Sequence, residues 1–280
     1  GLSVRCLKDV SPVSPEEGAA CDDGNNNTYN DVWDLNATSC AGTPAVAEDG
    51  SGPCEGALTV NYNGYDYLLV EIGEQCWFRE NLQTIQFLNG DSIPSSFVNS
   101  YSGHGALAAA TAAGPMVAAF ASNESNLAYF GGLYNHAAVT DSRGLCPAGW
   151  HVPHDDEWAQ LTIELGMPEA EAYNTNWTGS GALIGPQLRN NDFYLGSNSS
   201  GFSALHGGNF ASNGQYYSFG EMATFWSSEA SGGGAWLRAL GNHNGIQRQL
   251  SNVLNGLSVR CLKDVSPVSP EEGAACDDGN

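Results

Sequence analysis

The sequence predicts an α+β fold of short antiparallel strands, one or two helices and long loops, plus a small disulfide-stapled module. Three observations support this prediction. Short runs of alternating apolar and polar residues recur along the chain, which indicates strands with one buried face. Residues 155–165 have the clearest spacing of an amphipathic helix. Gly occurs 35 times in 280 residues, which favours many turns and loops between the elements.

An internal repeat organises the chain. Residues 1–25 read GLSVRCLKDVSPVSPEEGAACDDGN, and the same string returns unchanged at residues 256–280. The offset is 256 − 1 = 255 residues, which is long enough for a full core and a second small module. We therefore expect one complete repeat unit and the start of the next, cut from a longer tandem array. A duplication introduced by cloning is the alternative explanation.

The repeat suggests how the unit is divided. We expect five parts, taken in chain order: the last strand of the preceding repeat (1–10), a Pro-rich linker (11–20), a disulfide-stapled Asp/Asn-rich module (21–53), the main domain (54–264) and the start of the next linker and module (265–280). The two prolines of the linker, Pro12 and Pro15, favour an extended, semi-rigid spacer between globular units.

The charge of the chain restricts its partners and its location. The net charge is −22, and Lys stands only at Lys8 and Lys263, which are the same position of the repeat. So acidic a surface repels phosphate backbones and anionic lipids, which excludes nucleic acid as an expected partner. No run approaches the roughly 20 apolar residues needed to cross a bilayer, so no membrane insertion is expected. These features predict a secreted, extracellular protein at the cell surface.

The cysteines predict disulfides. Eight are present, and counting the repeat once leaves six positions. An even number in a chain of extracellular character predicts three bonds per unit, with several pairings open. The preferred pairing is Cys21–Cys40, Cys54–Cys76 and Cys146–Cys261. Cys6 and Cys276 would then be unpaired or bonded to a neighbouring copy. The absence of a CxxC pair argues against zinc.

The segment after Cys21 has the oxygen pattern of a calcium loop. Counting from Asp23, oxygen-bearing side chains fall at places 1, 3, 5, 9 and 12, and place 7 would contribute a backbone carbonyl. We therefore expect a structural calcium ion. Thr28 replaces the glycine of an EF-hand at place 6, and the alternative is an Asx-rich turn held by Cys21–Cys40. The expected ligands are Asp23, Asn25, Asn27, Tyr29, Asp31 and Asp34.

The elements of residues 1–128 follow from local patterns. Apolar residues alternate at 2, 4 and 6, which predicts a strand over 1–10. Residues 54–82 read as a β-meander with a hairpin turn at Asn63-Gly64, and its last part is a strand or a short helix. Residues 89–128 are expected to be irregular, with the Ala-rich run 106–121 as a packed loop or short helix.

The clearest helix follows residue 153. His154 or Asp155 caps it, and the acidic residues of its first turn complement the helix dipole. Trp158, Leu161 and Leu165 share one face, and Gly166 ends the helix. A second short helix is expected over 168–173. The remaining chain predicts short strands around the segments that start at residues 201, 223, 235 and 256.

Seven distinctive sequence blocks follow one another along the chain. They are QCWFREN from Gln75, GLYN from Gly132, LCPAGWHVP from Leu145, EW at Glu157, GFSALHGG from Gly201, FWSSE from Phe225 and SVRC from Ser258. Together they resemble the Fibrobacter-type major paralogous domain. The resemblance extends from about residue 58 to residue 264, and the blocks stand in the family's order. Separately, residues 21–44 resemble a CDDGN…NDV…CAGTP module found between domains of Bacteroidota surface proteins.

This resemblance implies a C-type-lectin-like fold in a secreted, multidomain surface protein, often an adhesin. In such a fold a bond from the helical half to the last strand suits Cys146–Cys261. The family carries no defined catalytic residues, and the sugar-binding calcium motifs of C-type lectins are absent from this sequence. No calcium-dependent sugar site is therefore transferred.

The remaining candidates for chemistry each have a plain structural explanation. His151 and His154 flank a helix start and suit capping better than a metal site, and His206 suits the interior. Of the tryptophans, Trp177 stands in the most polar context and is the best candidate for a ligand-binding aromatic. No hydrolase, zincin, phosphate-binding or dinucleotide motif occurs, so we expect no enzyme.

The function that these observations predict is structural. The chain is expected to be the repeat unit of a long secreted filament or adhesin used for attachment to cells or surfaces. Its expected partners are neighbouring copies of the same repeat in a homo-oligomeric filament. The alternative is a glycan- or protein-binding module displayed in tandem, with its ligand on the loops of residues 174–220.

Overall fold

The computed structural model describes residues 21, 25, 27–34, 39–47, 49–95, 114–192 and 195–265. The predicted strand 1–10 and linker 11–20 lie outside these residues, as do Cys6 and Cys276. The first half of the Ala-rich run, residues 106–113, also lies outside them. The order of the elements is β1 (Thr28–Asp34), β2 (Ser39–Pro44), β3 (Thr59–Tyr62), β4 (Tyr65–Ile72), β5 (Gln75–Phe78), β6 (Val117–Ala118), η2 (Phe120–Ser122), α2 (Glu124–Phe130), β7 (Leu133–Tyr134), α3 (His136–Val139), β8 (Trp150–His151), α4 (Asp155–Glu164), α5 (Glu169–Ala172), β9 (Asn176–Thr178), α6 (Ile184–Leu188), β10 (Asn209–Phe210), β11 (Tyr216–Tyr217), β12 (Ala223–Ser231), β13 (Gly234–Leu240), β14 (Ile246–Ser251) and β15 (Leu262–Lys263).

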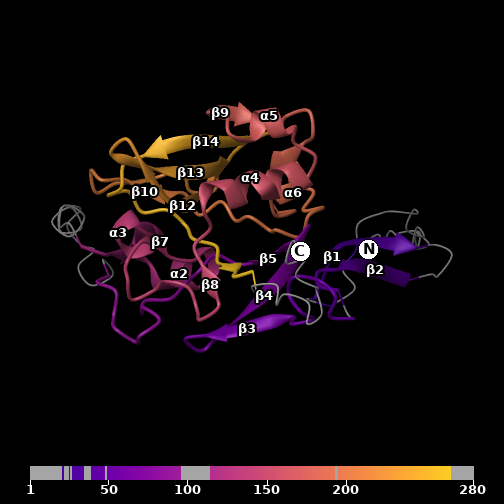
Figure 1. Cartoon of the computed structure of the whole chain (residues 1–280), viewed down its shortest axis with the longest axis horizontal. Helices are drawn as coiled ribbons and strands as arrows, with labels where there is room; N and C mark the ends of the chain where they lie inside the picture. The colour runs from indigo at the N-terminus through magenta and orange to yellow at the C-terminus, as the bar shows by residue number, and fades with distance from the viewer. Residues whose placement is uncertain are drawn as a thin grey trace, which may run out of the picture.

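Two antiparallel sheets form the body of the domain. One has the strand order β3-β4-β5-β15-β8 and the other β12-β13-β14-β9. The four-stranded sheet lies at the top of Figure 1 with α4 beside it, and the hairpin β3–β4 lies at the bottom. Three short strand pairs, β1–β2, β6–β7 and β10–β11, stand outside these sheets. The fold is therefore α+β and mostly antiparallel, as the sequence predicts.

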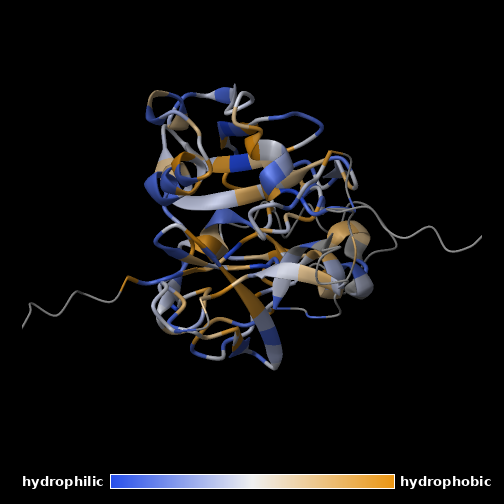
Figure 2. Cartoon of the chain, turned by 90° about the vertical axis from the view of Figure 1, so that its right-hand side faces the viewer, coloured by the Kyte–Doolittle hydropathy of each residue, from blue (hydrophilic) through white to orange (hydrophobic). Residues whose placement is uncertain are grey.

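The core lies between the sheets. One buried cluster joins Phe78 of β5 to Trp226 of β12, and a second joins Trp77 of β5 to Trp158 of α4 and Phe225 of β12. Neighbouring residues of one strand thus face different parts of the core. Figure 2 shows hydrophobic colour on strand and helix segments of both halves and hydrophilic colour on many of the loops.

The predicted hairpin and helix are both confirmed. Asn63 and Gly64 have φ angles of 51° and 82°, the pair of positive values that a two-residue hairpin turn requires. In α4, Trp158 and Leu161 are buried and Leu165 is half-buried beside the same cluster. His154 is the N-cap residue, and its N–H donates to Glu157 Oε2 at 2.7 Å. Gly166 follows the helix with a φ of 96°.

Several elements differ from the prediction. The stretch 89–128 was expected to be irregular, yet α2 begins inside it, capped by the Asn123 side chain on Ser125 N–H. The expected one or two helices become α2 to α6 within the described residues, although α4, with ten residues, is the longest of them. The strands β9 and β14 were not expected. β9 is a three-residue edge strand, and β14, which lies between β13 and β9, has the largely polar sequence IQRQLS without regular alternation of apolar and polar residues.

The segment of residues 256–264, here called the closing segment, runs between the two halves of the domain, as the yellow end of the chain in Figure 1 shows. The sequence pattern predicted one buried face for this stretch. In the structure Leu257, Val259 and Cys261 are buried, but so are Ser258 and Arg260 between them. Both faces are covered because the segment lies between the two sheets instead of on a surface.

The disulfides agree with the preferred pairing. The bonded pairs are Cys21–Cys40, Cys54–Cys76 and Cys146–Cys261. Their loops span 19, 22 and 115 residues. The last bond therefore constrains the largest part of the unfolded chain, and it fixes the closing segment to the connection that precedes α4.

Candidate functional site

The predicted calcium segment folds as one strand of a hairpin. Residues 28–34 form β1, which pairs with β2 and contains a bulge between Tyr29 and Val32. Ahead of it, the Asn25 side chain accepts the Asn27 N–H at 3.0 Å, and the Asn25 carbonyl accepts the Thr28 N–H at 3.1 Å. This is the geometry of the Asx turn that the sequence offered as the alternative.

The described members of the predicted ligand set face different partners. Tyr29 packs on the core next to Gly201, and burial raises the pKa of its phenol. Asp31 lies near the Arg79 guanidinium, which also donates to the Thr28 carbonyl at 3.2 Å. Asp23 and the Asp34 side chain lie outside the described residues. Within those residues no group of three or more His, Cys, Asp or Glu surrounds a common point, and the calcium ion stays a prediction.

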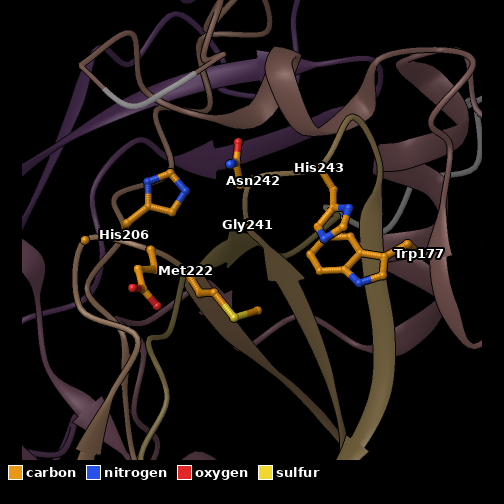
Figure 3. Close-up of a pocket in the computed structure, with 8 residues that line it drawn as sticks. Trp177, His206, Met222, Gly241, Asn242 and His243 are labelled. Carbon is orange, nitrogen blue, oxygen red and sulfur yellow. The ribbon is translucent and has the colours of Figure 1, made fainter.

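Trp177 lies in the wall of a cavity of about 390 Å³. The residue belongs to β9, the edge strand of the four-stranded sheet, where it pairs with Gln247 of β14. Its ring stacks on His243 with centroids 4.1 Å apart and planes 29° apart. Trp177 is half-buried, in contrast with Trp158 and Trp226, which are fully buried in the core. The cavity is shown in Figure 3, and its lining consists of Trp177, His206, Gly220, Glu221, Met222, Gly241, Asn242 and His243.

The β13–β14 connection brings His243 to Trp177, and Arg189 holds this connection in place. Arg189, at the end of α6, donates one guanidinium nitrogen to the carbonyls of Gly241 and His243. Gly185 N–H donates to Asn244 O at 2.8 Å, which adds a backbone contact from α6. The absence of a side chain at residue 241 matters here, because a Cβ would approach the Trp177 ring to 3.3 Å. The aromatic wall is therefore preformed.

The opposite side of the cavity comes from residues 206–222. His206 is buried, and burial together with the nearby Arg189 charge lowers its pKa to about 4, so its ring is neutral at pH 7. Glu221 lines the cavity and is exposed. Met222 extends toward the aromatic wall in Figure 3. The cavity thus combines an aromatic face, a thioether, a carboxylate and the Asn242 amide, which suits a neutral ligand rich in hydroxyl groups.

The model of the Fibrobacter succinogenes major domain matches residues 70–263. The chain belongs to the Fibrobacter succinogenes major domain family. The match begins somewhat later than the resemblance at residue 58 and ends at the same strand. Comparisons with curated proteins and with solved structures gave no match. The family is typical of extracellular surface proteins. Within the described residues, no helix has the length and apolar character needed to cross a membrane.

The two histidines at the start of α4 have structural roles in the major domain. His151 Nδ1 lies 2.6 Å from Asp264, and its Nε2 lies 2.9 Å from Glu157. Burial alone lowers the His151 pKa, but the two carboxylates outweigh this effect and raise it. His154 Nδ1 lies 3.0 Å from Ser228 Oγ. These contacts join the helix start to the closing segment and to β12, in line with the capping role expected from the sequence.

Sequence reasoning selected Trp177 but missed the residues that surround it in the major domain. His243 and Asn242 lie in a short polar stretch, GNHNG, between two strands of which only the first was expected. That stretch is a hairpin signal, since paired Asn and Gly residues mark tight turns. Recognising it would have placed His243 on a connection beside β14, although the contact with β9 depends on the tertiary fold.

Proposed function

We propose that the chain is the repeat unit of a long secreted cell-surface filament or adhesin, with a structural role in attachment to cells or surfaces. The observation that carries this proposal is the unchanged return of residues 1–25 at positions 256–280. Identical segments 255 residues apart place the same surface at a fixed period along a chain, which favours linear and lateral association of copies. Membership of a family of surface domains supports it.

In this proposal the unit is a rigid bead followed by a joint. The bead has a C-type-lectin-like fold, a proposal supported by the last strand pairing between β5 and β8 and by the Cys146–Cys261 bond. The joint consists of the Pro-rich spacer and the next copy of the hairpin module, stiffened by Cys21–Cys40 and by a calcium ion. The partners are neighbouring copies of the same repeat.

Imaging of the native, unfragmented protein by electron microscopy tests this proposal. The expected result is a filament whose axial repeat equals one bead and one joint, with the same period in every segment. Separate globular particles of one unit, with no strings of beads, would refute the tandem filament. Calcium removal by a chelator, imaged in parallel, reports on the joint, and an increase in bending between beads is expected.

A second candidate function is glycan binding, and the cavity beside Trp177 is the observation that favours it. Sugars place apolar C–H faces on aromatic rings and their hydroxyls on carboxylates and amides, and this cavity offers Trp177, Glu221 and Asn242. The neutral His206 ring adds no positive charge to it at pH 7. Filament and glycan binding are compatible, because each bead of an array would present the same cavity.

A glycan array with the single unit tests this second candidate. Saturable binding that is lost in Trp177→Ala and kept in Tyr129→Ala is expected. Tyr129 is a matched control because it is an aromatic with an exposed fraction of 58% and does not line the cavity. Equal binding by both variants would remove the cavity from the explanation.

A further inference from the structure

His151 lies between two carboxylates at the point where the chain leaves the major domain. It belongs to β8, where it pairs with Leu262 of β15 in the closing segment. Its Nδ1 lies 2.6 Å from Asp264 Oδ1, and its Nε2 lies 2.9 Å from both carboxylate oxygens of Glu157. The residue after Asp264, Val265, has an exposed fraction of 83%. The His151 ring therefore connects the start of α4 to the last residue of the closing segment.

This arrangement requires a proton on each ring nitrogen of His151. An ionised carboxylate only accepts hydrogen bonds, whereas a neutral imidazole has one N–H and one nitrogen with a lone pair. A neutral ring would therefore direct a lone pair at the oxygens of Asp264 or of Glu157. Burial lowers the His151 pKa, but the two carboxylates outweigh burial and raise the pKa above its usual value, in agreement with this geometry. The ring in this structure is an imidazolium that serves both carboxylates.

Of the two contacts, deprotonation breaks the one to Asp264. Glu157 Oε2 also accepts the His154 N–H at 2.7 Å, and the Glu157 side chain has an exposed fraction of 21%. The Asp264 side chain has an exposed fraction of 54% and can turn into water. The remaining proton stays on Nε2 beside Glu157, because leaving the less exposed carboxylate without a donor costs more free energy. The Nδ1 proton goes to solvent, and a lone pair then faces Asp264.

The charged groups on the neighbouring elements have partners of their own. They are Lys263 with Glu55, Asp155 with Arg238 and Arg248, Glu229 with the Asp155 N–H, and Asp156 with the Glu157 N–H. Glu74 lines a cavity of about 220 Å³ together with Asp264, so a second carboxylate faces this side of the segment. The His154 ring lies 5.8 Å from the His151 ring, but its Nδ1 contacts Ser228 Oγ at 3.0 Å. His151 is therefore the titrating group that contacts Asp264.

We propose that His151 is a pH switch for the chain exit of the major domain, Asp264 and Val265. As an imidazolium, His151 holds the Asp264 carboxylate. After loss of the Nδ1 proton it releases Asp264 and frees the chain that follows. The release is local, because Cys261 stays bonded to Cys146 and Lys263 stays paired with Glu55. The chain exit is thus held at low pH and free at high pH.

The switch is a property of one domain, and its consequence for an array rests on the proposed function. In a tandem array the chain after Asp264 is the spacer to the next hairpin module, since residues 264–280 repeat residues 9–25. A held Asp264 fixes the direction in which the spacer leaves the bead, and a free Asp264 adds a point of rotation there. Neighbouring beads would therefore bend more widely above the His151 pKa than below it.

NMR of the full chain labelled with nitrogen-15 tests the switch. Spectra are recorded from about pH 5.5 to about pH 9, where histidine titrates but carboxylates and lysine do not. The readouts are the shifts of the two His151 ring nitrogens and the heteronuclear NOE of the Val265 amide, which reports motion on the ps–ns timescale. The expected result is loss of the Nδ1 proton with a fall in the Val265 NOE at the same midpoint. A Val265 NOE that stays constant through the His151 titration would overturn the proposal, and so would loss of the Nε2 proton.

The variant Asp264→Asn assigns the effect to the contact with Asp264. It keeps the size of the side chain but removes its charge, so the His151 pKa should fall and Val265 should be mobile over the whole pH range. Protonation and the contact are linked, so one pH unit between the two His151 pKa values equals a tenfold weakening of the contact on deprotonation. Equal His151 pKa values in the two proteins would contradict the coupling.

Two histidine variants separate His151 from its neighbour. His151→Gln should abolish the pH dependence of the Val265 NOE, and the matched control His154→Gln should retain it. The reverse pattern would assign the switch to His154 and overturn the proposal. Asp264→Asn decides the question even where His151→Gln does not fold, because the Asp264 side chain is more than half exposed.

Electron microscopy of the native protein at the two ends of this pH range separates the switch from the filament. Wider bending between beads at high pH is expected, and equal bending at both pH values would refute the role of the switch in an array. Separate particles of one unit would refute the filament and leave the switch intact, because the NMR result concerns a single domain. Filaments together with a constant Val265 NOE would refute the switch alone.

Discussion

Replacing Asp155 by Asn removes one buried charge from the centre of the contact between α4 and the four-stranded sheet. Asp155 Oδ1 accepts Arg238 Nη1 at 2.6 Å, and its Oδ2 accepts Arg248 Nη2 at 2.7 Å. The exposed fractions of Asp155 and Arg238 are 4% and 1%. Burial raises the Asp155 pKa, but the two guanidinium groups outweigh it and hold the pKa below its usual value.

The expected loss of stability follows from this burial. Breaking a buried ion pair by removing one partner costs about 3–5 kcal/mol, because the other charge stays buried without compensation. Arg238 is the residue left in this position, while Arg248 keeps its bond to the Tyr173 carbonyl at 2.7 Å. With roughly 2–4 °C of melting temperature per kcal/mol for a domain of this size, the shift is about 6–20 °C.

Urea unfolding of the chain under non-reducing conditions, followed by tryptophan fluorescence, measures this loss. Asp156→Asn is the matched control, since Asp156 is the next residue in the same helical turn and is exposed. Its loss should not exceed about 1 kcal/mol, the size of a helix-dipole contact. Equal losses for the two variants, or a loss below about 1 kcal/mol for Asp155→Asn, would refute the reasoning.

Three further predictions concern pH, disulfides and calcium. The His151 pKa is raised in the folded state, so the contribution of His151 to stability is complete below the unfolded pKa of about 6.5 and is lost as the pH rises through the folded pKa. Melting curves at several pH values should show this loss of stability. In His151→Gln this part of the pH dependence should be absent. Replacing Cys146 and Cys261 by Ser should lower the free energy of unfolding by about 5 kcal/mol, and replacing Cys21 and Cys40 should lower it by about 3 kcal/mol, because the loops span 115 and 19 residues. A larger loss for the Cys21 and Cys40 variant in urea unfolding would contradict the chain-entropy reasoning. Calcium should raise the melting temperature of the unit but not that of Asp23→Asn/Asp34→Asn; an equal shift for both proteins would exclude these two carboxylates as ligands.

Local signals in the sequence were sufficient for some elements of the fold. The Asn63-Gly64 pair fixes a hairpin because both residues tolerate a positive φ, whatever lies around them. The helix at Asp155 combines a cap, acidic residues in the first turn and a buried stripe, so three independent signals agree. The repeat reduced eight cysteines to six positions, which predicted three bonds but left several pairings open, and the preferred pairing is the one in the structure.

Other features depend on tertiary contacts that no local pattern encodes. The alternation in residues 256–261 suggests a half-exposed strand, and Arg260 reads as an outward-facing residue. It is buried because its donors meet carbonyls from Phe78 and Phe202, residues far away in the sequence. The Trp177 cavity is a similar case: its wall needs His243, which Arg189 positions from a third segment. In both cases a buried arginine, Arg260 or Arg189, fixes the local structure through hydrogen bonds to residues far away in the sequence.

The closing segment also determines how the proposed array would respond to tension. A pulling force enters the bead through the chain that follows Asp264, three residues after Cys261. The Cys146–Cys261 bond, at a sequence separation of 115, carries that force across to residue 146, so the residues between the two cysteines are excluded from extension. Those residues include α4, β9 and the whole four-stranded sheet, and therefore the cavity at Trp177. A filament built from such beads would lengthen at its spacers and hairpin modules first. The part of each bead that could hold a ligand would keep its geometry under load, a property that reduction of the disulfide would remove.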